Sequence, residues 1–195
     1  MAKLIRSPRS RLSIPPHTSL DAFDLFTLFY CWNCFPWGDE DGGARWCARI
    51  YREPADERAV PLEPPSVEGR VTRPCHLDTT PVPMIPPILE LEELDLELAE
   101  RIERHPEYPD IYELLEERLV GPSIDPRRAE STIGGHPRWI QAEQCPRTPS
   151  GKRYRLLAQL DSEPEPGWMW GDAGILYLFV APEAPFDLRM VVQCH

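Results

Sequence analysis

Proline restricts the fold of this chain more than any other residue type, because 24 of its 195 residues are prolines, against a usual share of about 5 %. Proline fixes the φ angle and has no main-chain N–H, so it interrupts helices and the interior strands of sheets. Nine of the prolines fall in residues 53–87, which we interpret as an extended connector. Long helices are therefore expected only in the proline-poor residues that follow the connector.

Residues 88–119 are rich in leucine and glutamate and predict helices. The apolar side chains repeat at helical spacing at Leu91, Leu94, Leu98 and Ile102. This pattern predicts one helix over 88–104 and a second over 111–119. Residues 90–119 contain twelve acidic and three basic side chains, so most of the net charge of −11 lies there. A solvated acidic face explains such a run, and a site for a basic partner is the alternative.

Strand patterns lie on both sides of the helices. Residues 23–30 and 44–51 are rich in aromatic and β-branched side chains and predict two antiparallel strands. Four more strand candidates lie between Pro/Gly turns, at 139–143, 155–160, 174–180 and 188–194. Their close succession favours an antiparallel meander. The predicted fold class is α+β, predominantly antiparallel β-sheet with an acidic helical insert at 88–119.

Residues 20–195 are long enough for a single domain with its own core. Residues 1–19 are basic and proline-rich, and we expect a disordered arm there. The sequence shows no secretory signal and no apolar run of about 20 residues that could span a bilayer. Its acidic charge argues against nucleic acid as a ligand. We therefore expect a cytoplasmic protein that binds neither membranes nor nucleic acid.

The cysteines raise the question of a metal. In the cytoplasm, six cysteines are expected to be reduced thiols rather than disulfides. The first four are spaced so that they could hold a structural zinc: Cys31, Cys34, Cys47 and Cys75. However, a predicted strand runs into Cys31, and a second C-x-x-C does not follow. We expect buried thiols and no cofactor, with structural zinc as the alternative.

The most distinctive loop lies in residues 157–174. Trp168 and Trp170 are followed by a run of small residues that contains Asp172. Two indoles beside small residues and a carboxylate could frame a shallow groove for a peptide or small ligand. The alternative is a hairpin connection in which a tryptophan covers the core and the aspartate caps a turn.

Catalysis has little support in the motifs. Signatures of nucleotide binding, of serine hydrolases and of zinc proteases are missing from the sequence. An enzyme would need titratable groups that meet in one cleft, and the set that could do so is Asp161, Asp172 and His136.

Four short motifs stand one after another in the second half of the chain: GGHPRWIQ at 134–141, LLAQLDS at 156–162, MWGDAG at 169–174 and VQC at 192–194. This ordered series resembles the YwqG-like family, a bacterial group of uncharacterised proteins. The resemblance implies a β-rich α+β fold of two related halves. It also implies kinship with eukaryotic proteins of the programmed-cell-death-protein-2 type, which act as adaptors or chaperones for ribosomal proteins. Because a first copy of the motifs is missing, we expect an incomplete N-terminal half, which either folds alone as a minimal form or completes its sheet in a homodimer.

The sequence therefore predicts protein or peptide binding in an adaptor or chaperone-like role. A partner that binds the acidic surface is expected to be basic. The predicted binding groove is lined by Trp139, Gln141, Gln159, Asp161, Ser162, Trp170 and Asp172. Three other classes stay open: an enzyme that uses the titratable set above, a metal-stabilised interaction domain, and an immunity-type protein.

Overall fold

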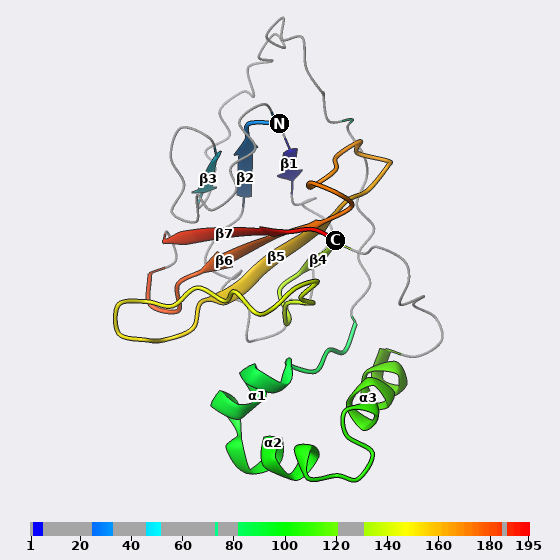
Figure 1. Cartoon of the computed structure of the whole chain (residues 1–195). Helices are drawn as coiled ribbons and strands as arrows, with labels where there is room; N and C mark the ends of the chain where they lie inside the picture. The colour runs from blue at the N-terminus through cyan, green and yellow to red at the C-terminus, as the bar shows by residue number, and fades with distance from the viewer. Residues whose placement is uncertain are drawn as a thin grey trace, which may run out of the picture.

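The computed structural model describes residues 2–5, 25–32, 46–51, 73, 82–120, 131–184 and 187–195. Within them the chain forms two antiparallel sheets and three helices (Figure 1). The predicted α+β class with antiparallel sheet is confirmed. Each helix in the described residues is too short or too polar to cross a membrane.

The first sheet has the strand order β1-β2-β3, with β1 at Ala2–Ile5, β2 at Leu25–Tyr30 and β3 at Trp46–Tyr51. The antiparallel pairing of β2 with β3 confirms the prediction for these two segments. Strand β1 corrects the expectation of a disordered arm for residues 2–5, because these residues pair antiparallel with β2. Three of the four residues, Ala2, Leu4 and Ile5, are apolar, and as an edge strand β1 needs main-chain hydrogen bonds to β2 alone. The rest of the predicted arm, and most of the connector, lie outside the described residues.

The second sheet is an antiparallel meander in the order β4-β5-β6-β7. Its strands are β4 at Thr132–Ile133, β5 at Arg155–Asp161, β6 at Ile175–Val180 and β7 at Leu188–Gln193. Strands β5, β6 and β7 confirm three of the four predicted segments. The fourth prediction, a strand at 139–143, is wrong: these residues form a loop over the sheet, and glutamine side chains bind its main chain in place of a neighbouring strand.

A hydrophobic core lies between the two sheets, whose strands cross one another (Figure 1). The first sheet contributes Leu28 and Trp46, and the second contributes side chains from β5, β6 and β7. Trp170 closes one end of this core. Its indole stacks on Trp32, with ring centroids 4.9 Å apart, and meets the ring of Tyr30 edge-on at 5.0 Å.

The helices are α1 at Ile88–Leu94, α2 at Leu96–Glu103 and α3 at Asp110–Val120. The single helix predicted over 88–104 is broken at Asp95, whose Oδ1 accepts a hydrogen bond from the Leu98 main-chain N–H at 3.0 Å. Aspartate favours this N-cap position because it satisfies an N–H that lacks a helical partner. The predicted helix over 111–119 is confirmed by α3.

Candidate functional site

The second sheet separates two hydrophobic clusters, and the predicted site residues are divided between its faces. Alternate side chains of β6 enter the cluster between the sheets and the cluster on the outer face. Trp170 is buried between the sheets, whereas Trp139 packs on the outer cluster, 4.8 Å from the Tyr177 ring and 5.8 Å from the Phe179 ring. The single groove predicted to contain both indoles is therefore wrong.

A β-bulge in β5 decides where Gln159 points. The register with β6 shifts between Leu156 and Ala158, so that Gln159 lies opposite Tyr177, whose side chain belongs to the outer cluster. Gln159 is fully buried there, and its Oε1 accepts a hydrogen bond from the Arg138 main-chain N–H at 3.0 Å. The Tyr177 hydroxyl donates to the Arg138 carbonyl. These two side chains together fix the main chain of Arg138.

Gln193 of β7 holds the next part of the same loop. It is fully buried, and its Oε1 accepts hydrogen bonds from the main-chain N–H groups of Ile140 and Gln141, both at 3.1 Å. Its Nε2 donates to the Ala142 carbonyl at 2.8 Å. The side chain of Gln141 donates to the Cys194 carbonyl at 2.6 Å. The glutamines of the motif series thus attach the 138–142 loop to the sheet.

Ser162 fastens the base of the loop that contains Trp170. Its Oγ donates to the Gly174 carbonyl at 2.8 Å and accepts from the Trp170 main-chain N–H at 2.9 Å. The Trp170 Nε1 donates to the Asp161 carbonyl at 3.3 Å. Gly174 is required at this point, because a Cβ would lie 2.1 Å from the Gln193 carbonyl oxygen. The chain is therefore tightly packed where the sequence predicted a groove.

The three candidates for acid–base chemistry have separate surroundings. Asp161 is buried, and this burial raises the pKa of its carboxyl group, although its Oδ1 accepts from the Ser162 N–H at 2.6 Å. Asp172 is exposed. His136 Nδ1 lies 3.1 Å from Oε1 of Glu90 on α1. No hydrogen bond or ion pair joins Asp161, Asp172 and His136 in the part of the chain that the structure describes.

Two of the four cysteines considered for zinc, Cys31 and Cys47, are described. Cys31 is half-buried just after β2, and Cys47 is exposed on β3. Cys34 and Cys75 lie outside the described residues, so the zinc hypothesis stays a prediction. Among the residues described, no three His, Cys, Asp or Glu side chains are arranged to hold a metal ion.

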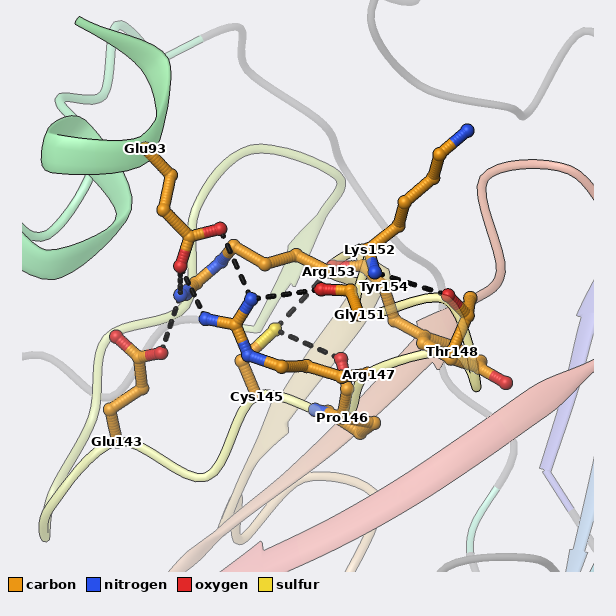
Figure 2. A network of polar contacts seen from close by, with 10 residues as sticks. All are labelled: Glu93, Glu143, Cys145, Pro146, Arg147, Thr148, Gly151, Lys152, Arg153 and Tyr154. Carbon is orange, nitrogen blue, oxygen red and sulfur yellow. Dashed lines mark hydrogen bonds and ion pairs between the residues drawn. The ribbon is translucent and has the colours of Figure 1, made fainter.

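A network of charged side chains, which sequence reasoning missed, ties α1 to the turn at 147–153 (Figure 2). Arg153 Nη1 lies 2.6 Å from Glu143 Oε1 and 3.1 Å from Glu93 Oε1. Arg147 also pairs with Glu93, and its hydrogen bond, followed by that of Arg153, lowers the pKa of the Glu93 carboxyl group. Arg153 and Glu143 are nearly buried, with side chains 11 % and 15 % exposed. Two glutamates and two arginines make up the network, so its positive and negative charges balance.

Cys145 lies inside this network but is not an activated thiol. Its Sγ donates weakly to the Tyr154 carbonyl at 3.5 Å and to the Pro146 carbonyl at 3.6 Å (Figure 2). Burial raises the pKa of Cys145 to about 11, so the thiol is protonated near neutral pH. Since the thiolate is the nucleophilic form, Cys145 is poorly suited to covalent catalysis.

Residues 27–188 match the family model of a domain of unknown function, DUF1963. The chain belongs to the DUF1963 family. The matched region runs from β2 to the start of β7 and contains all seven predicted site residues. A search among curated proteins found no match to this chain.

In this DUF1963 chain the helices expose large apolar side chains. Within the described helices, the leucines exposed by more than a third are Leu89, Leu94, Leu96, Leu98, Leu114 and Leu115. Leu94 and Leu96 are the most exposed of them, at 65 % and 58 %. The buried positions of α1 and α2 are Leu91 and Ala99. We define the six exposed leucines as the helical leucines.

Proposed function

We propose that this DUF1963 chain is a protein- or peptide-binding module of the YwqG-like type, with an adaptor or chaperone-like role in the cytoplasm. One observation carries the proposal: the three helices expose the helical leucines between carboxylate side chains. Full burial of a leucine side chain stabilises a protein or a complex by about 1.5–3 kcal/mol. An exposed leucine can contribute this free energy only when a partner covers it. Exposed apolar side chains rimmed by polar ones are typical of protein interaction sites.

The surroundings of the polar side chains support binding over catalysis. Gln159 and Ser162 bind main-chain groups of the protein itself, and His136 lies against Glu90. The Cys145 thiol is protonated near neutral pH. Because these groups are engaged in holding the fold, we propose that the protein is not an enzyme and needs no cofactor.

We also propose that residues 88–119 are an acidic insert in a two-sheet fold. The attachment of α1 supports this view. Glu90 and Glu93 contact His136, Arg147 and Arg153, which lie in the loops beside the second sheet and outside its strands. Helix α1 is thus attached to these loops by charged side chains, while the strands keep their own main-chain pairing.

The test is comparative capture of proteins from the native cell, with the purified chain as bait. The variant is Leu94→Ser with Leu96→Ser, and the control is Met169→Ser, which removes a side chain that is 46 % exposed and lies away from the helices. We expect a protein that the wild type and the control retain and that the double variant loses, with circular dichroism unchanged. Identical captured sets for all three baits would refute the proposal.

A further inference from the structure

We propose that a basic amphipathic helix of another protein covers the two most exposed helical leucines, Leu94 and Leu96. This inference rests on the proposed function and specifies the partner class. It joins two independent observations on α1 and α2, the exposure of leucines and the excess of carboxylates without a cation.

The first observation is the position of the apolar side chains. Leu94 ends α1 and Leu96 begins α2, so both lie at the break around Asp95. Leu98, at 38 % exposed, lies two residues after Leu96 and therefore on the other side of α2. A partner that covers Leu94 and Leu96 must itself bring an apolar stripe, because burying polar groups against leucine without hydrogen bonds is unfavourable.

The second observation is the charge around these leucines. Glu100 is paired with Arg104 at 2.7 Å, but Glu97 and Glu103 are exposed and form no ion pair within the described residues. Glu103 lies two helical turns after Leu96, on the same side of α2. Residues 90–119 contain twelve acidic side chains and only three basic ones. The partner's apolar stripe must therefore be flanked by lysine or arginine.

Charge also decides between this partner and the other candidates. In a symmetric dimer through α1 and α2, both copies would bring the same acidic surface to the interface, so carboxylates of one copy would lie near carboxylates of the other, and like charges at an interface are unfavourable. An anionic membrane surface and nucleic acid would be repelled for the same reason. A basic helix satisfies both the apolar and the charged requirement.

A helix is the conformation that fits best, because an amphipathic helix presents apolar side chains at i, i+3, i+4 and i+7 with basic side chains beside them. The probe is a fluorescein-labelled synthetic peptide of leucine and lysine in that pattern. Two control peptides accompany it: a scrambled one with the same composition, and one with glutamate in place of lysine. Each is titrated with the full chain, and binding is followed by fluorescence anisotropy.

We expect the lysine amphipath to bind, the other two peptides to bind far more weakly, and the affinity to fall as salt is raised. The Leu94→Ser and Leu96→Ser double variant should weaken binding by about tenfold or more, and Met169→Ser should leave it unchanged. Replacing Glu97 and Glu103 by glutamine should weaken binding by about threefold to tenfold at low salt. Equal binding of the scrambled peptide, or equal affinity of the leucine variant, would overturn the proposal.

The outcome separates this inference from the proposed function. If the lysine amphipath does not bind while the leucine variant still loses a captured protein, the basic-helix partner is wrong and the protein-binding function stands. If the leucine variant loses no captured protein either, both are wrong.

Discussion

Replacing Gln193 with leucine should lower the free energy of unfolding by about 2–4 kcal/mol. Leucine has a similar size but cannot form the three hydrogen bonds of Gln193 to the 138–142 loop. Each buried main-chain group left without a partner costs about 1–3 kcal/mol. The sum is reduced because Gln141 and Ala142 are exposed residues, so their main-chain groups can reach water if the loop shifts.

Urea unfolding at 25 °C, followed by circular dichroism, measures this loss. The control is Gln141→Leu, which removes one hydrogen bond from an exposed side chain on the same loop. The control should lose less than about 1 kcal/mol. A loss for Gln193→Leu that is no larger than the loss for Gln141→Leu would show that Gln193 does not hold the loop.

Three other predictions follow from contacts of the second sheet. Gly174→Ala should lower the free energy of unfolding by about 3 kcal/mol or more, because the new Cβ would meet the Gln193 carbonyl oxygen at 2.1 Å; a melting temperature unchanged from the wild type would contradict this. Burial raises the pKa of Cys145 to about 11, so iodoacetamide should alkylate this thiol far more slowly than the exposed Cys47. Equal alkylation rates of the two cysteines, measured by peptide mass spectrometry, would contradict this prediction. Burial raises the pKa of Asp161, so its contribution to stability is present below the unfolded-state pKa and is lost as pH rises through the folded-state pKa. Asp161→Asn should therefore gain stability relative to the wild type as pH rises from acidic to neutral, and parallel pH profiles in urea unfolding would exclude this role.

The strands were predictable where apolar runs are bounded by turn residues. Residues 155–160, 174–180 and 188–194 have such patterns, and they form β5, β6 and β7 of the meander. Residues 139–143 have a similar pattern of Trp139 and Ile140 beside polar residues, but their main-chain partner is Gln193, more than fifty residues away. Local periodicity carries no information about a side chain from so distant a strand.

The break in the first helix had a local signal that the leucine spacing obscured. Asp95 is a favoured N-cap residue, and here it ends α1 and caps α2. Because Asp95 has the non-helical angles φ −155° and ψ 86°, the spacing of a single helix does not continue through it. Leu94 ends α1 and Leu98 belongs to α2, and both are exposed.

The predicted site residues belong to the second sheet and its loops, but they lie on its two faces and not in one groove. The β-bulge at 156–158 reverses the side on which Gln159 would lie in a regular strand, and this reversal cannot be inferred from a period of two. The charged network at Glu93, Glu143 and Arg153 was missed because it joins an acidic helix to a turn 60 residues later. The sequence did contain a signal for this network, because Arg147 and Arg153 are basic residues in an acidic chain and need acidic partners.

The burial of β6 on both faces affects the tendency of a partly unfolded chain to self-associate. Ile175–Val180, with the sequence ILYLFV, is buried at every position, since the first sheet covers one face and the 138–142 loop packs over the other. Six uncharged residues of high β propensity without proline form the kind of segment that stacks into intermolecular β-structure. The loop held by Gln193 covers only the outer side chains of this segment, so loosening it would expose Ile175, Tyr177 and Phe179. The main chain of β6 stays paired with β5 and β7 until the sheet itself opens, so self-association through β-structure requires loss of an edge strand as well.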